Sequence, residues 1–494
     1  MSIEMMNTIN VTINKIKNIN NFNIDIPLEN GIYALVGANG CGKSTIMLAL
    51  SQLVGKFNLS QLTEDAYTDD SYINYIFKGL EDKWYQVNGF WKVSVHPKIE
   101  INGRYEGSLF YGSRFNDSKH VDTLIKENKI NSESIVDSDA YIIENLSYIL
   151  HGDFEHYKTL KRLKNKFIAK DLGLSNTPYF SVFNEKIVSQ YRMSSGECLL
   201  VSLLHFIYNS IIRRSLPTNK PILLLIDEIE LALHPVAITR LIDLLKSILK
   251  NTKNLTIILT SHSPEVIRSI EPENTYKINN TFGDVTVVTP CYPSYSIREL
   301  YDSNDGYDFT LLVEDKLAKI IVEKLILKNN LTVSKLIKVV PVGGWENVLQ
   351  LHKDLIDNGV LGVGRKVISI LDGDVVGKIN KDYDAYTKLF LPVKSVEKFL
   401  LEILINKPNV SLKTKINDKY FVVESIDMVI SQYLKYLRDT NSKDKNGKKL
   451  YFAIKKNLES HNISEEVFIH NLCDEIMSEI NFSNFEISLT KILS

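Results

Sequence analysis

Residues 37–44 read GANGCGKS, which matches the phosphate-binding pattern G-x-x-x-x-G-K-[ST] at every required position. The stretch lies between a predicted strand, Ile32–Val36, and a predicted apolar helix. Glycines in such a loop let backbone N–H groups turn inward around phosphates. Lys43 would reach the β- and γ-phosphates, and the Ser44 hydroxyl would bind Mg²⁺. The residues that we expect to bind ATP here are Gly37, Asn39, Gly40, Cys41, Gly42, Lys43, Ser44 and Thr45.

A second stretch, Ile222–Ile226, predicts a buried strand that is followed directly by Asp227 and Glu228. Downstream of a phosphate-binding loop, a strand that ends in two carboxylates indicates an ATP-hydrolysing site. Asp227 would hold the Mg²⁺ shell, and Glu228 would be the general base that polarises the attacking water.

The predicted strands and helices around these motifs alternate as in an α/β protein. Period-two alternation predicts two strands at residues 9–13 and 22–26, joined by a polar turn. Residues 55–175 are irregular and predict short strands followed by helices. From Ser194 onward helices alternate with strands, the last at Leu255–Leu259. This pattern predicts a mainly parallel sheet covered by helices on both faces.

A polar stretch, Tyr301–Gly306, predicts a linker to a second series of strands and helices. The strands of this series are expected at Thr310–Val313, Ile337–Val340 and Val367–Leu371. Beyond about residue 405 the pattern is helical and charged. The predicted domains are residues 1–300 (with an insert at about 55–190), 308–405 and 406–494.

Composition excludes several classes of protein. The 494 residues are 44% hydrophobic and 24% charged, which is typical of a globular protein. The net charge is -1, so any nucleic-acid surface must be a local basic patch. Four widely separated cysteines argue against a disulfide framework and a zinc site. The longest apolar stretch, Cys198–Tyr208, is too short to span a bilayer, so we expect a cytoplasmic protein with no membrane partner.

Two further motifs resemble those of ABC-type ATPases. Residues 193–197 read MSSGE and precede a predicted helix, as the ABC signature motif does. Residues 260–264 read TSHSP and resemble the switch-histidine region. The resemblance implies a head-to-tail dimer in which the signature of one protomer binds the γ-phosphate of ATP held by the other. The residues that it adds to the ATP site are Ser194, Ser195, Gly196, Glu197 and His262.

The stretch after the strand carboxylates narrows the resemblance further. Residues 227–235 read DEIELALHP, which is similar to the D-E-P-E-x-x-L-H-P of chromosome-associated and OLD-type (overcoming lysogenization defect) ATPases, with Ile229 in place of the usual proline. About 150 residues without sustained heptads separate the phosphate-binding loop from Ser194, which argues against long coiled-coil arms. The sequence offers no convincing Q-loop glutamine, and residues 110–115 stand where that loop is expected.

Acidic residues follow two strands of the second series. Glu314 follows one strand, and Asp372 and Asp374 follow another. Because the carboxyl ends of parallel strands meet at one edge of a sheet, we expect these three residues to converge there. Three carboxylates stay close only when they are protonated or neutralised by divalent cations. The arrangement resembles the Toprim domain of topoisomerases, primases and OLD nucleases.

The resemblance to OLD nucleases extends to residues 395–397, SVE, which fit an S-x-E that contributes to a second metal. The family's first motif carries another acid where this chain has Ala318, and the neighbouring Asp315 is a candidate to compensate. The metal ligands implied are Ser44 and Asp227 in the first domain, and Glu314, Asp372, Asp374, Ser395 and Glu397 in the second.

Basic residues supply two further predictions. OLD nucleases use a lysine near the C-terminus to stabilise the charge that develops during phosphodiester cleavage, and Lys448 and Lys449 are the candidates. A basic run either follows a DNA backbone or forms a solvated helix face. Its residues are Lys158, Lys161, Arg162, Lys164 and Lys166.

Taken together, the resemblances imply an ATP-regulated, metal-dependent DNA endonuclease of OLD type. It would be both an ATPase and a phosphodiester hydrolase, with ATP and Mg²⁺ as cofactors and Mn²⁺ as an alternative ion at the Toprim site. Its partners would be DNA, a second copy in a homodimer or higher even-numbered oligomer, and subunits of a phage-defence complex such as a retron.

Two alternatives remain open at this stage. The first is a regulatory ABC-type ATPase whose degenerate Toprim domain binds DNA or a partner without cleaving, which Ala318 favours. The second is a topoisomerase or primase, for which the sequence offers neither a nucleophilic-tyrosine module nor a zinc-binding cysteine cluster.

Overall fold

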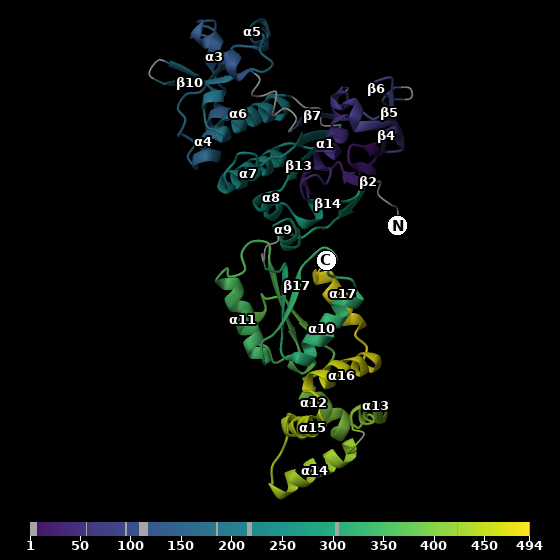
Figure 1. Ribbon diagram of the computed structural model, residues 1–494. Helices are drawn as coiled ribbons and strands as arrows, with labels where there is room; N and C mark the ends of the chain where they lie inside the picture. Colours follow the sequence, from purple (N-terminus) through teal and green to yellow (C-terminus); the bar gives the residue numbers. More distant parts are fainter. Residues whose placement is uncertain are drawn as a thin grey trace. The chain divides into compact units, whose positions relative to one another are not determined.

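The computed structural model describes residues 7–55, 57–93, 96–107, 117–183, 186–214, 220–301, 306–421 and 423–493. The chain divides into two compact units, Met1–Asn304 and Asp305–Ser494. Figure 1 colours the first unit from purple to teal and the second from green to yellow. The predicted Q-loop stretch 110–115 and most of the predicted linker lie outside the described residues.

The first unit is built on an 11-stranded sheet. From edge to edge, its strands are β6 (Phe90–Val93), β5 (Leu80–Val87), β4 (Tyr67–Phe77), β1 (Thr8–Ile16), β2 (Ile19–Pro27), β15 (Asp284–Val288), β14 (Thr275–Thr281), β3 (Gly31–Val36), β13 (Leu255–Ser261), β12 (Ile222–Ile226) and β7 (Asn102–Glu106). The strands from β14 to β7 are parallel, whereas β6, β5, β4, β1 and β2 pair antiparallel. The sheet is therefore mixed rather than mainly parallel, because short turns can join only antiparallel strands.

The parallel strands bury side chains on both faces. Along β3, Tyr33 and Leu35 join one hydrophobic cluster, while Ile32, Ala34 and Val36 join another. This alternation is the period-two rule of a strand, and it explains the near-continuous apolar runs that the sequence shows. The helix α1 (Lys43–Ser51) packs in the first cluster. The helices of the second cluster are α4 (Ala140–His151), α6 (Ser195–Ile207), α7 (Pro235–Asn251), α8 (Pro264–Ser269) and α9 (Pro293–Tyr301).

A smaller antiparallel sheet lies within the predicted insert. Its order is β11 (Lys186–Ser189), β10 (Tyr179–Phe183), β9 (Lys161–Leu163) and β8 (Ile135–Asp137). The helices α3 (Ser118–Lys126) and α5 (Lys166–Asp171) belong to this region. The basic run is not a single helix face, because Lys161 and Arg162 lie on β9, where Lys161 pairs with Asp137 at 2.7 Å.

One helical stretch of the described residues, Ser195–Ile212, is long and apolar enough to cross a membrane. It comprises α6 and a π-helical continuation, η4 (Tyr208–Ile212). Half of this stretch is buried, and Leu200, Leu204 and Ile207 pack in the second hydrophobic cluster against the sheet. Its apolar composition is therefore explained by core packing.

The second unit contains a four-stranded parallel sheet. Its order is β17 (Ile337–Pro341), β16 (Phe309–Val313), β18 (Lys366–Leu371) and β19 (Lys388–Phe390). Its helices are α10 (Lys316–Lys328), α11 (Trp345–Asp357), α12 (Val396–Leu401) with the π-helical η8 (Glu402–Asn406), α13 (Val410–Tyr420), α14 (Ile426–Asp439), α15 (Lys448–Ser460), α16 (Glu465–Glu479) and α17 (Ser483–Leu493).

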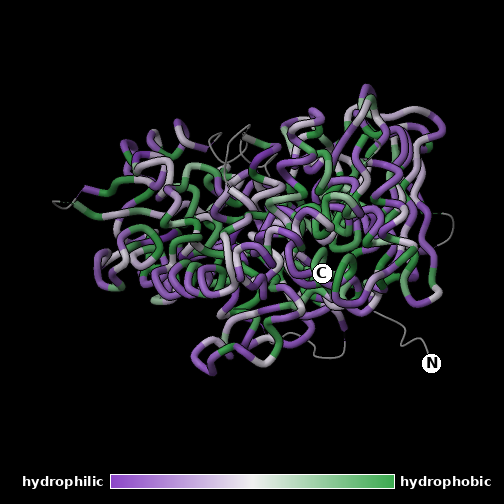
Figure 2. The backbone as a smooth tube through the Cα atoms, turned by 90° about the horizontal axis from the view of Figure 1, so that it is seen from below, coloured by the Kyte–Doolittle hydropathy of each residue, from purple (hydrophilic) through white to green (hydrophobic). Residues whose placement is uncertain are grey.

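The predicted α/β class is confirmed, and every strand predicted around a motif is present within three residues of its expected ends. The alternation of hydrophobic and hydrophilic residues that supported these predictions is visible as changes of colour along the backbone (Figure 2). Short, half-buried elements of the insert, such as β8 and β9, carry no such pattern and were not located individually.

Candidate active sites

The phosphate-binding loop joins β3 to α1, as its sequence predicts. Gly37 has a φ of 155°, and a Cβ there would lie 2.5 Å from the carbonyl oxygen of Ile278. Gly42 caps α1 with a φ of 107°. The Lys43 Nζ donates hydrogen bonds to the carbonyls of Gly37 (2.9 Å) and Ala38 (3.1 Å), and burial lowers the pKa of this ammonium. The loop therefore surrounds its lysine with backbone dipoles, and only glycine fits at position 37.

The other predicted residues of the loop differ in exposure. Asn39 and Gly40 are exposed, Ser44 is half-buried, and Cys41 and Thr45 are buried. The backbone of the loop and the Ser44 hydroxyl are therefore the groups most accessible to a phosphate and its cation.

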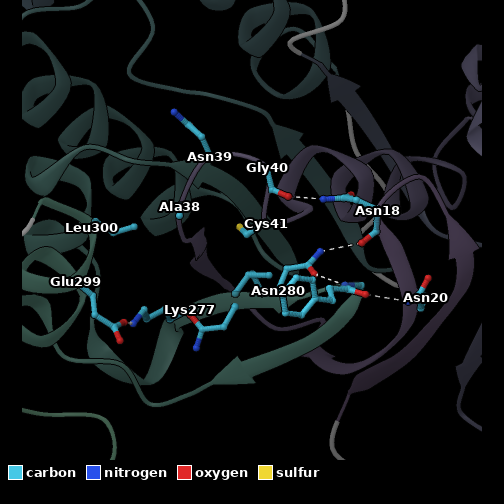
Figure 3. A pocket seen from close by; sticks show the side chains of 14 residues that line it. Asn18, Asn20, Ala38, Asn39, Gly40, Cys41, Lys277, Asn280, Glu299 and Leu300 are labelled. Carbon is cyan, nitrogen blue, oxygen red and sulfur yellow. Dashed lines mark hydrogen bonds and ion pairs between the residues drawn. The ribbon is translucent and has the colours of Figure 1, made fainter.

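A pocket of about 650 Å³ adjoins this loop (Figure 3). The Asn18 side chain, in the turn between β1 and β2, donates to the carbonyl of Gly40, and Asn280 donates to the carbonyl of Asn18 at 2.8 Å. On the other side of the pocket, the buried Lys277 pairs with Glu299. The hairpin of β1 and β2 thus contacts the loop directly, and the hairpin of β14 and β15 supports it through Asn280.

Asp227 and Glu228 lie at the carboxyl end of β12, where Thr260 of the adjacent β13 connects them. The Thr260 hydroxyl donates to Asp227 Oδ1 at 2.5 Å and accepts from the Glu228 N–H at 2.8 Å. Glu228 has a φ of 52°, in the left-handed region, so its backbone turns sharply after the strand. Burial, together with Asp227 and Glu230, raises the pKa of Glu228, as expected for a carboxylate that serves as a base.

His262 lies beside the same group of residues. Its backbone N–H donates to Glu230 Oε1 at 2.5 Å, and Glu230 Oε2 is buried without a hydrogen-bond partner among the described residues. Burial and the nearby Lys43 lower the pKa of His262. The structure therefore groups Lys43, Asp227, Glu228 and His262 in one place. Glu230 also belongs to this group; the sequence analysis did not select it, although it is the second glutamate of the DEIE stretch.

The residues of the predicted signature motif form the first turn of α6. Ser194 caps the helix in a capping box: its hydroxyl donates to Glu197 Oε2 at 2.6 Å and accepts from the Glu197 N–H at 3.3 Å. Tyr157 donates to the other oxygen of Glu197 at 2.5 Å. A Cβ at Gly196 would lie 2.9 Å from the carbonyl oxygen of Ala232. Ser194 and Ser195 are exposed, and no hydrogen bond between described residues joins them to the phosphate-binding loop.

In the second unit, Glu314 and Asp372 meet at the carboxyl ends of the neighbouring parallel strands β16 and β18. The Asp372 N–H donates to Glu314 Oε1 at 2.7 Å. Asp372 is 2% exposed, and its Oδ2 is buried without a hydrogen-bond partner among the described residues. Burial and the nearby Asp315, Glu314 and Asp374 raise the pKa of Asp372 to about 9. A buried carboxylate in this position attracts a cation or a proton.

Asp374 already has cationic partners. Lys398 Nζ donates to Asp374 Oδ2 at 2.6 Å, and Lys378 Nζ lies 3.3 Å from the same oxygen. Although burial alone would raise it, these lysines hold the pKa of Asp374 below its usual value. The sequence analysis missed Lys398, which directly follows Glu397 in the S-x-E motif.

Asp315 and Ala318 begin α10. Asp315 Oδ1 accepts from the Ala318 N–H at 2.8 Å and so caps the helix, while Asp315 Oδ2 is buried without a partner among the described residues. Burial raises the pKa of Asp315, and Glu397 contributes to this rise. Glu397 lies in the first turn of α12, and Ser395 is the N-cap residue of this helix. Asp315 thus supplies a second buried carboxylate oxygen near Asp372. Ala318 has no side-chain oxygen to supply.

The donor set fits a divalent cation, because hard oxygen ligands with an unpaired buried atom converge there. Among the described ranges, however, no three His, Cys, Asp or Glu side chains already stand in a metal-binding arrangement. Asp374 contacts Lys398 and Lys378 instead. The residues that would hold the ion are Glu314, Asp372 and Asp374, after Asp374 exchanges its lysine for the ion.

Lys448 and Lys449 line a different pocket, of about 680 Å³, with side chains of α14 such as Tyr433. Gly447, just before them, packs so closely on α12 that a Cβ would lie 2.1 Å from the Glu397 carbonyl oxygen. The two lysines therefore begin a helix next to the acidic site, while Lys398 and Lys378 are the lysines that contact Asp374.

Comparison with known proteins identifies one domain. Residues 116–267 match the family model described as an AAA ATPase domain. The matched stretch includes the MSSGE motif, the Asp227–Glu228 pair and His262, and the phosphate-binding loop precedes it. No curated protein matches the chain.

Three solved structures show distant similarity. One is an Smc head domain bound to the C-terminal domain of ScpA from Pyrococcus furiosus, with 16% identity and a TM-score of 0.34, covering 58% of this chain and 96% of that chain. Another is the SMC head domain from Thermotoga maritima, with 17% identity and a TM-score of 0.29 (57% and 99%). The third is the recombination mediator RecF with ATP, with 14% identity and a TM-score of 0.31 (58% and 100%). Similarity at this level assigns neither a function nor a partner. What the chain shares with known proteins is an ATPase domain, which binds ATP.

Proposed function

We propose that the chain is an ATP-regulated, divalent-metal-dependent DNA nuclease of OLD type, with an ABC-type ATPase in its first unit and a Toprim-like site in its second. The observation that carries the proposal is the contact of Glu314 with Asp372 at the ends of β16 and β18, beside a buried Asp372 oxygen that has no partner among the described residues. Such an arrangement costs stability unless a cation or proton neutralises it, and nucleases use sites of this kind.

In the first unit, Lys43 would bind the terminal phosphates, Asp227 the magnesium shell, and Glu228 the attacking water. The raised pKa of Glu228 and its position beside Asp227 support its role as the base. His262 would sense the γ-phosphate, since it lies against Lys43 and Glu230.

The signature residues support a dimer. Ser194 and Ser195 are exposed at the start of a 13-residue helix, where backbone N–H groups attract a phosphate. Among the described residues, no hydrogen bond joins them to the loop of the same chain, and they would serve the ATP of a second copy. This arrangement supports an ATP-dependent head-to-tail dimer as part of the proposal.

In the second unit, Glu314, Asp372 and Asp374 would hold Mg²⁺ or Mn²⁺, with Ser395 and Glu397 near a second position. A bound ion supplies an activated water and stabilises the leaving oxygen. Lys398 would then contact a phosphate oxygen of the DNA once it leaves Asp374, in the role first expected of Lys448 or Lys449. A function in phage defence, in the cytoplasm and with partner subunits such as those of a retron, belongs to the same proposal.

A second candidate function is a regulatory ATPase whose Toprim-like site binds DNA or a partner without cleaving. The observations that favour it are the buried Ala318 at the position of a family acid and the lysine contacts of Asp374. Both reduce the negative charge that is available to a second ion.

Incubation of the full-length protein with supercoiled plasmid tests the choice. Four conditions, with and without Mn²⁺ and with and without ATP, should show cleavage only when Mn²⁺ is present and a change of rate with ATP. Glu314→Gln should abolish cleavage, while Glu323→Gln, at a half-buried residue of α10, should not. Metal-independent nicking, or equal cleavage by Glu314→Gln, would exclude the nuclease and leave the regulatory ATPase.

A further inference from the structure

A pocket of about 860 Å³ in the first unit, distinct from the phosphate-binding loop, is lined by cationic side chains. Its cations are Arg104, Lys166, Lys170, Arg213 and Arg214, and its one carboxylate is Glu106. All five cations are exposed around the pocket. In a chain with a net charge of -1, this is a strong local excess of positive charge.

These cations have no anionic partners in the part of the chain that the structure describes: none of the five side chains forms an ion pair or a hydrogen bond there. Nearby cations of the same insert do pair, as Arg192 does with Asp122 and Lys161 with Asp137. The positive potential reaches the floor of the pocket, where burial, with Arg162, Lys166 and Arg213, lowers the pKa of His205 to about 4.

The floor of the pocket is polar, neutral and already hydrogen-bonded. The Tyr179 hydroxyl lies 2.6 Å from His205 Nδ1. The buried Gln190 accepts from the Tyr179 N–H at 2.8 Å and donates to Ser202 at 3.1 Å. A ligand would therefore meet a preformed floor and find its charged partners only at the rim.

The local backbone places two of the rim arginines. At the end of α6 the helix widens into the π-helical η4, in which the Arg213 N–H bonds to the Tyr208 carbonyl at 2.9 Å. Such widened turns recur at functional sites. This one ends directly at Arg213 and Arg214, whose planar guanidinium groups suit bidentate contact with phosphate oxygens.

We propose that this pocket binds a phosphate-bearing ligand of nucleotide size, separately from the ATP of the phosphate-binding loop. Its volume lies within the range of small-ligand sites, about 300–1,000 Å³. The half-buried aromatic side chains of Tyr105 and Phe206 offer surfaces for a base or sugar. The phosphate comes either from a free nucleotide or from a nucleic-acid strand. Because Gln190 and Tyr191 of the pocket lie only four and three residues before Ser194, such a ligand would also bias the position of the signature residues.

Calorimetry on the full-length Lys43→Ala protein in EDTA tests the proposal, since that substitution and the chelator silence the loop and the metal sites. The probes are inorganic tripolyphosphate, a 5′-phosphorylated tetranucleotide and an unphosphorylated single-stranded dodecanucleotide. The added variants are Arg213→Ala/Arg214→Ala and, as matched control, the exposed pair Lys250→Ala/Lys253→Ala.

We expect one site per chain, with affinity reduced at least about tenfold in the arginine variant and nearly unchanged in the control. Preference for tripolyphosphate and the tetranucleotide would indicate a free or terminal phosphate. Preference for the dodecanucleotide would indicate a strand backbone. The proposal is overturned if every probe binds more weakly than about 1 mM, or if the arginine variant binds as the control does.

Discussion

At the scale of single residues, Thr260 fixes the geometry of the two acids at the end of β12, and Glu228→Gln preserves that geometry. The backbone bond from Glu228 to Thr260 and the Asp227–Thr260 bond remain. Loss of the base alone should lower ATP turnover by about 10²-fold or more, with ATP binding retained. A steady-state ATPase assay with a binding titration measures both. Glu271→Gln, on the same unit, is the control, and turnover equal to wild type in Glu228→Gln would remove this residue from the mechanism.

In the proposed metal site, Lys398 would compete with the ion for Asp374. In Lys398→Met the carboxylate loses a partly buried charge-assisted hydrogen bond, so the Mn²⁺ concentration that stabilises the protein should fall by about tenfold. Thermal unfolding at increasing Mn²⁺ concentrations measures the concentration that is needed for stabilisation. Lys378→Met should change this concentration by less than about twofold, because its contact is longer and its side chain is half exposed. An unchanged or higher Mn²⁺ requirement in Lys398→Met would show that Asp374 is not a ligand.

At the scale of elements, the loop between β3 and α1 distinguishes two glycines. Both Gly37 and Gly40 have positive φ, but a Cβ at Gly37 would lie 2.5 Å from the Ile278 carbonyl, whereas nothing lies within 4 Å at Gly40. Gly37→Ala should therefore abolish ATP binding and lower the melting temperature. Gly40→Ala should cost only about 1 kcal/mol of backbone strain. Calorimetric melting with ATP titration separates them, and equal effects of the two substitutions would contradict the close packing of β14 on the loop.

The same elements show what a sequence can predict. The phosphate-binding loop and the strands at Ile222–Ile226 and Leu255–Leu259 follow from local pattern, since spacing and continuous apolar runs determine them. Three-residue strands such as β8 and β9 depend on their partners in the sheet, so their sequences carry little signal.

The site residues also divide into those that local sequence predicts and those that only the fold brings to the site. Glu314 and Asp372 were predictable because each follows a strand. Lys398 was not, because its contact with Asp374 spans 24 residues and depends on how α12 packs. Glu230 was overlooked for a similar reason, since only the fold brings it to His262.

At the scale of the whole molecule, an ATP site shared between protomers requires two copies of the chain for hydrolysis. Lys43→Ala protein lacks a working loop, and Ser195→Arg protein lacks a working signature while keeping the Ser194 cap of α6. Each should be inactive alone. In an equal mixture that exchanges subunits freely, half of the dimers should be heterodimers, and each heterodimer has one of its two ATP sites intact. The mixture should therefore recover about a quarter of wild-type ATPase activity. Activity of the mixture equal to that of either protein alone, with exchange verified, would contradict the shared site.

The central claim is that the second unit cleaves DNA through its buried carboxylates, and Asp372→Asn tests it most directly. The amide keeps the size of the side chain and removes a buried carboxyl group that can ionise to bind a cation, so the fold and ATP hydrolysis by the first unit should persist. The measurement is the rate of plasmid cleavage in Mn²⁺ and ATP, with ATPase activity determined on the same preparation. We predict that cleavage falls by at least about 10³-fold, or some 4 kcal/mol of transition-state stabilisation, while ATP hydrolysis stays near wild type. Cleavage by Asp372→Asn at the wild-type rate would contradict the account.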